Sequence, residues 1–228
     1  MKIAFTTLGC KLNFAESSAL GKALLERGHT RAKQGEEADI CIINTCSVTD
    51  TADHKDRQAI HRIRRQNPNA ILIVTGCYAQ LKPGEIAQIE GVDFVLGQDE
   101  KFHLPEFIES LEFRVLISSG ERSEGMEGLE KLESERIKEL KSEGVKELEK
   151  SQISNLKSQI YISPIREVED FHGAYSKDDR TRCFLKVQDG CNYFCSYCTI
   201  PLARGKSRNP SIASVVKEAQ EALKGGAK

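Results

Sequence analysis

Short apolar runs alternate with segments of helical periodicity along the first half of the chain. The apolar runs predict strands at residues 3–7, 38–44, 70–75 and 94–96. The periodic segments predict helices at 15–27, 52–66 and 104–111, with a short helix opening at Pro83-Gly84. Strands that are apolar almost throughout are typical of a parallel sheet covered on both faces. Residues 1–112 are therefore predicted to form an α/β domain with helices on both faces of a parallel sheet.

The pattern changes after residue 112. Residues 119–162 are dense in Glu, Lys and Ser and repeat themselves, as KELKSE at 138–143 and KELEKS at 146–151. Mixed charges at helical offsets would support an exposed helix, but this composition is more typical of a solvated linker. We interpret 113–165 as a charged insertion or linker. In the last piece, 166–228, a strand at 181–188 and a helix opening at Ser211 predict one β-loop-α unit.

Composition narrows the class of protein. The 228 residues are 39% hydrophobic, enough for a core, and eight cysteines are too sparse for a disulfide scaffold. No apolar run approaches the ~20 residues that span a bilayer, and the first residues lead into a strand pattern without a signal-peptide core. We expect a cytoplasmic protein whose thiols stay reduced. A net charge of −1 does not by itself indicate nucleic-acid binding.

Three cysteines in the order C-x3-C-x2-C, at Cys191, Cys195 and Cys198, are the strongest chemical signal. Iron–sulfur clusters normally take four thiolates, so a cluster held by three has an iron that can bind another molecule. The gaps hold three aromatic residues that we expect to keep water off the cluster: Tyr193, Phe194 and Tyr197. A zinc site, which prefers paired C-x2–4-C elements and a fourth Cys or His, and a disulfide or free thiols are the alternatives.

Three further cysteines, Cys10, Cys46 and Cys77, each follow a predicted strand. The carboxyl ends of parallel strands meet at one edge of the sheet, so residues more than thirty positions apart would come together there. Gly9 and Gly76 would let the backbone approach a bulky ligand. We predict a second three-thiolate cluster; the alternative is three small core residues. Of the eight cysteines, the remaining two lie inside predicted strands and are interpreted as structural: Cys41 and Cys183.

The C-x3-C-x2-C run resembles the signature of the radical S-adenosylmethionine enzymes. The segments LGCKLN at 8–13, NTCSVT at 44–49 and GCYAQ at 76–80, with IPLARGKSR at 200–208, resemble the methylthiotransferase family within that group. The resemblance covers nearly all of residues 1–112 and 180–228. Among the branches of the family it is greatest for the one that acts on threonylcarbamoyladenosine in tRNA. The branches acting on isopentenyladenosine and on a ribosomal protein tend to carry YGCQMN-like and LGCPKN first motifs.

The resemblance implies two 4Fe–4S clusters and S-adenosyl-L-methionine as cofactors. The cluster on the C-x3-C-x2-C cysteines would generate a 5′-deoxyadenosyl radical, and the other would carry the sulfur that becomes a methylthio group at C2 of the modified adenosine. It implies no catalytic side chain beyond the cluster ligands. Tyr197 and Arg204 are candidate cofactor contacts, although packing is an equally good interpretation of Tyr197. The implied partners are a tRNA substrate, an electron donor and a sulfur source, without a membrane.

Other polar residues have two interpretations each. The basic run of His61, Arg62, Arg64 and Arg65 would either contact tRNA phosphates or form a solvated helix face. Residues beside the cluster loop are candidates for substrate or cofactor phosphate contact: Arg204, Lys206 and Arg208. Residues flanking the other cysteines would either donate hydrogen bonds to sulfur or cap turns: Asn13, Asn44 and Thr45.

Only thirty residues follow Cys198, whereas a closed (β/α)8 barrel takes ~250. We therefore expect an amino-terminal fragment of a longer enzyme, with an incomplete radical S-adenosylmethionine barrel, no RNA-binding barrel, and no activity alone. Within the family, the alternative substrates are another tRNA adenosine or a ribosomal protein. Outside it, the alternatives are a non-catalytic iron–sulfur electron carrier or scaffold and a zinc-stabilised RNA-binding module.

Overall fold

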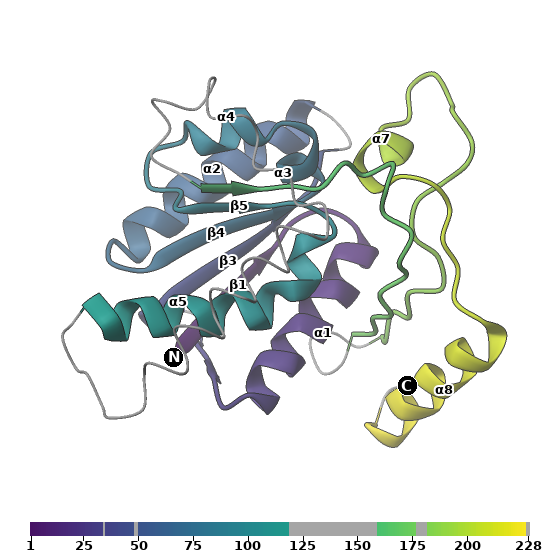
Figure 1. The fold of residues 1–228 in the computed structure, drawn as a ribbon, viewed down its shortest axis with the longest axis horizontal. Helices are drawn as coiled ribbons and strands as arrows, with labels where there is room; N and C mark the ends of the chain where they lie inside the picture. The colour runs from purple at the N-terminus through teal and green to yellow at the C-terminus, as the bar shows by residue number, and fades with distance from the viewer. Residues whose placement is uncertain (34, 48–49, 119–158, 177–181, 227–228) are drawn as a thin grey trace.

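The computed structural model describes residues 1–33, 35–47, 50–118, 159–176 and 182–226 (Figure 1). Six strands form one sheet in the order β2-β1-β3-β4-β5-β6, and every neighbouring pair is parallel. Their bounds are β1 Lys2–Thr7, β2 Thr30–Arg31, β3 Ile40–Thr45, β4 Ile71–Gly76, β5 Phe94–Leu96 and β6 Gln159–Tyr161. The predicted parallel sheet is confirmed. The charged segment 119–158 lies outside the described residues.

Helices cover both faces of the sheet, as predicted (Figure 1). They are α1 Lys11–Glu26, α2 Asp50–Gln66, α3 Cys77–Leu81, α4 Pro83–Ala87, the 3-10 helix η1 Glu100–His103, and α5 Leu104–Ser118. Alternate residues of β3 pack on opposite sides, because successive side chains of a strand point to opposite faces. Ile43 packs with Ile60 of α2, and Ile42 packs with Leu24 of α1 and Ile108 of α5. Two cores therefore hold the sheet between α2–α4 and the α1–α5 pair.

The predicted bounds differ from the observed ones most at the start of α1 and at the end of α5, which runs to Ser118 rather than to residue 111. The helix predicted at 15–27 begins at Lys11, directly after Cys10, whose extended backbone is its N-cap. Four short elements, β2, β6, α3 and η1, contain two to five residues each and show no periodicity that could have predicted them. Among the described helices, none is both long enough and apolar enough to cross a membrane.

The carboxyl-terminal part corrects one prediction. Residues 182–188 do not form the predicted strand; the segment makes one isolated bridge, between Leu185 and Tyr175, and Thr181 lies outside the described residues. A strand requires a continuous ladder with a neighbour, and this segment lies beside irregular chain instead. Cys183, half-buried, consequently lies in irregular structure rather than in a strand.

Two helices follow the C-x3-C-x2-C loop. They are α7 Ile200–Arg204 and α8 Ile212–Lys224. The predicted start of the second is confirmed, because Ser211 is its N-cap and its hydroxyl accepts a hydrogen bond from the Ser214 amide at 3.2 Å. The helix α7 packs against α3, which places it beside the carboxyl edge of the sheet (Figure 1).

Arg64 belongs to the fold rather than to a free basic surface. Its guanidinium donates to the carbonyls of Ala70 at 2.8 Å, Pro68 at 3.0 Å and Gly91 at 2.9 Å, and pairs with Asp93 at 2.7 Å. It thereby ties the end of α2 to the turns before β4 and β5. The other members of the basic run are exposed: His61, Arg62 and Arg65.

We predict that Arg64→Met lowers the free energy of unfolding by about 2 kcal/mol, because it leaves backbone carbonyls without their donors. Arg62→Met, on the same helix but exposed, serves as the control and should change it by less than about 0.5 kcal/mol. Urea unfolding followed by circular dichroism measures both. Equal stability of the two variants would contradict the structural role of Arg64.

Candidate metal centre

The first group of cysteines lies where the sequence predicts, past the ends of three adjacent strands. Cys10 precedes α1 after β1, Cys46 follows β3 directly, and Cys77 begins α3 after β4. The order β1-β3-β4 makes these three loops neighbours at one edge of the sheet. Cys46 and Cys77 are buried, Cys10 is exposed, and none of the three forms a disulfide.

Two glycines let these loops approach one another. Gly9 has a φ of +93°, and a Cβ there would lie 2.6 Å from the Sγ atom of Cys46. Gly76 has a φ of +102°, and a Cβ there would lie 2.6 Å from the Thr45 amide nitrogen. A side chain at either position would collide with the neighbouring cysteine loop and would strain the backbone. Glycine is therefore required for the loop carrying Cys10 to contact the one carrying Cys46.

The environment of these thiols suits a thiolate-held group. The side-chain amide of Gln98 donates to the Cys77 sulfur at 3.1 Å, a contact that orients this sulfur. The backbone amide of Cys46 donates to Asp56 at 2.9 Å. Burial raises the pKa of Asp56 to about 7, an effect that the hydrogen bond from Cys46 opposes. Among the described residues, no three His, Cys, Asp or Glu side chains already converge in a metal-binding arrangement, so ligation by these cysteines stays a prediction.

The second group of cysteines lies in the loop before α7. Its ends are fixed: the Cys191 amide donates to the Gly205 carbonyl at 3.1 Å, and the Thr199 hydroxyl donates to the Ser47 carbonyl at 3.1 Å. The second bond joins the residue after Cys198 to the residue after Cys46. These hydrogen bonds thus hold the two cysteine groups at the same edge of the sheet, although the groups are far apart in sequence.

The aromatic residues of this loop do not shield it. Tyr193, Phe194 and Tyr197 are 78%, 80% and 88% exposed, which contradicts the expectation that they keep water off the site. The loop is held at its two ends, and its middle projects away from the protein. The contact between Tyr197 and a cofactor stays a prediction, for which its ring is accessible.

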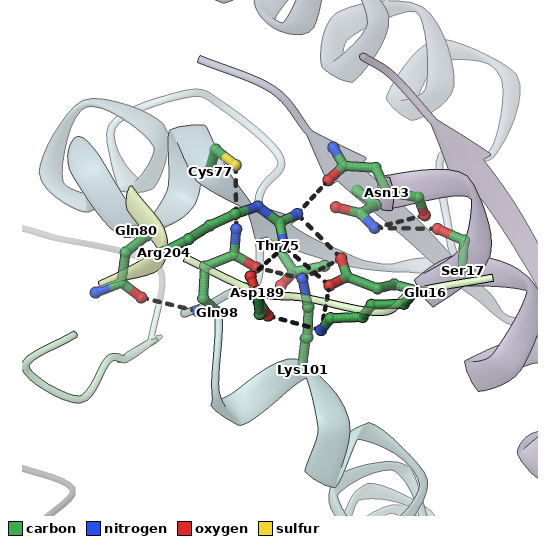
Figure 2. Close-up of polar contacts among 12 residues, drawn as sticks. Asn13, Glu16, Ser17, Thr75, Cys77, Gln80, Gln98, Lys101, Asp189 and Arg204 are labelled. Carbon is green, nitrogen blue, oxygen red and sulfur yellow. Dashed lines mark hydrogen bonds and ion pairs between the residues drawn. The ribbon is translucent and has the colours of Figure 1, made fainter. Parts of the chain in front are cut away.

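A buried charge network joins α1, which begins directly after Cys10, to α7, which follows Cys198; Figure 2 shows its Glu16 and Arg204 in contact. Arg204 of α7 donates to Glu16 of α1 at 2.9 and 3.1 Å, to Asp189 at 3.0 Å and to the Asn13 side chain at 2.7 Å. Lys101 donates to Glu16 at 2.5 Å. Lys186 donates to Glu16 at 2.9 Å and pairs with Asp189 at 2.6 Å. Each charged side chain of the network is at most 7% exposed.

The network decides the charge of Glu16. Burial alone would raise the pKa of this carboxyl, but Arg204, Lys101 and Lys186 together hold it well below the usual value. Glu16 is therefore an anion held by three cations. The same balance lowers the pKa of Asp189, where burial is again outweighed, chiefly by Arg204 and Lys186.

Arg204 is consequently not an exposed residue available for phosphate contact. Its guanidinium is occupied by the network, and any contact with a cofactor stays a prediction. Arg208, also expected to contact phosphate, donates to the Val168 carbonyl at 3.1 Å. Of the three basic residues considered beside the loop, Lys206 alone is exposed.

Sequence reasoning missed the other charged members of the network: Glu16, Lys101, Lys186 and Asp189. One signal was present for Glu16. It falls with Asn13, Leu20 and Leu24 on the buried side of α1, at spacings of three and four residues. A charged residue at a core position of an amphipathic helix requires an oppositely charged partner, but the spacing does not identify that partner.

The residues flanking the first three cysteines join neighbouring elements of the fold. The Asn13 amide donates to the carbonyls of Leu8 and Thr45, both at 2.9 Å. Asn44 donates to the Ser17 hydroxyl at 3.1 Å, and the Thr45 hydroxyl donates to the Thr75 carbonyl at 2.5 Å. The bonds of Asn13 fit the turn-capping interpretation, whereas Asn44 and Thr45 lie inside β3 and bond to α1 and β4. Bonds from these residues to sulfur stay a prediction.

Residues 2–97 match the Uncharacterized protein family UPF0004. The threonylcarbamoyladenosine tRNA methylthiotransferase MtaB of Bacillus subtilis is 36% identical over 226 residues, 99% of this chain and 42% of that protein. The protein of the same name from Aquifex aeolicus is 33% identical over 96% of this chain and 44% of its own length. The ribosomal protein uS12 methylthiotransferase RimO of Chloroflexus aurantiacus is 29% identical over 99% of this chain and 44% of its own length.

These similarities extend over nearly the whole chain and confirm the resemblance that its cysteine motifs indicate. The chain belongs to the methylthiotransferase family. It spans less than half the length of these curated relatives.

The raised pKa of Asp56 predicts a pH dependence of stability. Between pH 4 and about 7 the folded chain keeps a proton on Asp56 that the unfolded chain releases, so the free energy of unfolding falls as pH rises. Asp56→Asn keeps an oxygen to accept from the Cys46 amide and removes the titration. It should be more stable than the parent at pH 8 by about 1–3 kcal/mol, with little difference at pH 4.

Urea unfolding of the metal-free chain from pH 4 to 8 measures this difference. Asp170→Asn, at an exposed position, is the control and should leave the profile of the parent unchanged. Parallel profiles for Asp56→Asn and the parent would contradict the prediction.

Proposed function

We propose that this chain is the cluster-bearing part of a radical S-adenosylmethionine methylthiotransferase. The observation that carries the proposal is the joining of two three-cysteine groups at one sheet edge, through the bond between Thr199 and Ser47 and through Arg204. A cluster that only carries electrons normally takes four protein ligands, whereas two groups of three suit a reaction that binds a molecule at each cluster. The names of the relatives support the same class of reaction.

The proposed substrate is N6-threonylcarbamoyladenosine beside the anticodon of a tRNA, which would receive a methylthio group at C2. Relatives named for this substrate are 36% and 33% identical to the chain. A tRNA-2-methylthio-N(6)-dimethylallyladenosine synthase and the uS12 enzyme also match, each at 29% identity. The assignment among branches therefore depends on the motifs around Cys10, Cys46 and Cys77.

The proposal assigns a different role to each group of residues. Cys191, Cys195 and Cys198 hold one 4Fe–4S cluster, and the cysteines at the sheet edge hold the other. When bound, the clusters and S-adenosyl-L-methionine supply the electron, the radical and the sulfur and methyl groups. Tyr197 presents an accessible ring to the adenine of the cofactor, and the exposed Lys206 is available for a phosphate. An electron donor and a sulfur source complete the set of partners, in the cytoplasm.

Metal content tests the two clusters. After anaerobic reconstitution we expect about eight irons and eight sulfides per chain. Either triple variant, Cys191→Ala/Cys195→Ala/Cys198→Ala or Cys10→Ala/Cys46→Ala/Cys77→Ala, should retain about four. The matched control is Cys41→Ala/Cys183→Ala, which removes two thiols outside both groups and should retain all eight. Zinc in place of iron, or loss of all iron in one triple variant, would contradict the proposal.

Binding of S-adenosyl-L-methionine separates an enzyme from an electron carrier. Its addition should change the EPR spectrum of the reduced variant that lacks Cys10, Cys46 and Cys77, because one iron of the remaining cluster is open. It should not change the spectrum in the same way when the C-x3-C-x2-C cysteines are removed. An unchanged spectrum in both would favour a carrier.

The substrate is tested in the organism that carries the gene. Disruption of the gene should remove 2-methylthio-threonylcarbamoyladenosine from digested tRNA and leave 2-methylthio-isopentenyladenosine in place, as measured by mass spectrometry. Loss of the second nucleoside instead would assign the chain to another branch.

A further inference from the structure

The buried network carries an excess of positive charge. Its cations are Lys101, Lys186 and Arg204, and its anions are Glu16 and Asp189. Arg208, 3.5 Å from Asp189 and 10% exposed, adds to the excess at its edge. Buried charge is costly unless it is balanced, so three cations around two carboxylates call for a further anion close by.

Hydrogen bonds lead from the network to the loops of all three cysteines of the first group. Gln98 accepts from Lys101 and donates to the Cys77 sulfur, the latter at 3.1 Å (Figure 2). Asn13 accepts from Arg204 and donates to the carbonyl of Leu8, in the loop before Cys10.

Asn13 also reaches the carbonyl of Thr45, the residue before Cys46. The side of the network that faces Cys77, where Gln98 links Lys101 to the Cys77 sulfur, is the place where a further anion would be stabilised.

We propose that this network is the counter-charge of the cluster bound by Cys10, Cys46 and Cys77, and that it raises the reduction potential of that cluster. The inference rests on the proposed function, because it requires a cluster at these cysteines. Reduction adds one electron from an external donor to the cluster and breaks no bond. The reduced cluster is the more negative form, so nearby buried cations stabilise it relative to the oxidised form.

The potential of this cluster can be measured alone in the Cys191→Ala/Cys195→Ala/Cys198→Ala background. The protein is reduced stepwise with dithionite in the presence of mediators, and the reduced cluster is followed by EPR. Arg204→Met should lower the ratio of reduced to oxidised cluster at a fixed potential by about tenfold, equal to 59 mV for one electron. Lys101→Met removes a second cation of the network and should shift the potential in the same direction.

Three matched variants separate charge from packing. Arg204→Lys keeps the charge and should keep the potential, although it loses the forked hydrogen bonds. Glu16→Gln removes an anion and should shift the potential in the opposite direction. Arg27→Met removes a cation at the C-cap of α1, sixteen residues of helix away from Cys10, and should leave the potential unchanged.

The outcomes are distinct. Opposite shifts for Arg204→Met and Glu16→Gln, with Arg204→Lys unchanged, support the inference. An unchanged potential in Arg204→Met and Lys101→Met, or shifts of Glu16→Gln and Arg204→Met in the same direction, overturns it and leaves the proposed function intact. A background protein that binds no iron overturns the proposed function as well, since no cluster is then formed at the sheet edge.

Discussion

The burial of Glu16 among three cations is the interaction on which the arrangement of this chain depends. Its partners are 85, 170 and 188 residues away in sequence, so one carboxylate joins α1, the segment after β5 and both sides of the C-x3-C-x2-C loop. Removing an ion from water costs several kcal/mol, and only close pairing with further hydrogen bonds offsets that cost. The segment from 182 to 208, which contains no strand among its described residues, is therefore positioned by charge pairing at defined atoms rather than by a backbone ladder.

The sheet domain could be predicted because its signals are local. Four of its strands are nearly continuous apolar runs, and the long helices place apolar residues at helical spacing, so periodicity alone separates them. The locations of Cys10, Cys46 and Cys77 then follow from topology, since parallel strands end at one edge. The short strands β2 and β6 contain two and three residues and carry no such signal.

The charge network could not be predicted, because its members have ordinary local contexts. Glu16 occupies a core position of α1, but the sequence around it does not indicate that Lys186 or Arg204 is its partner. The sequence predicted a strand at 181–188, where Lys186 instead buries its ammonium group against two carboxylates. Arg204 was interpreted as a candidate phosphate contact for the same reason. The sequence shows that a residue is charged, but not which oppositely charged residue it contacts in the fold.

The burial of these ion pairs also determines how they respond to solution conditions. At 0.1 M, salt screens interactions between exposed charges over about 10 Å. The surface pair of Arg27 and Glu109 is screened in this way. Buried ion pairs, from which water and salt ions are excluded, are screened much less. The attachment of α7 to the sheet edge should therefore vary little with ionic strength. The two cysteine groups would keep the same relative position in the dilute buffers of a reconstitution and in the salt concentrations of a cell.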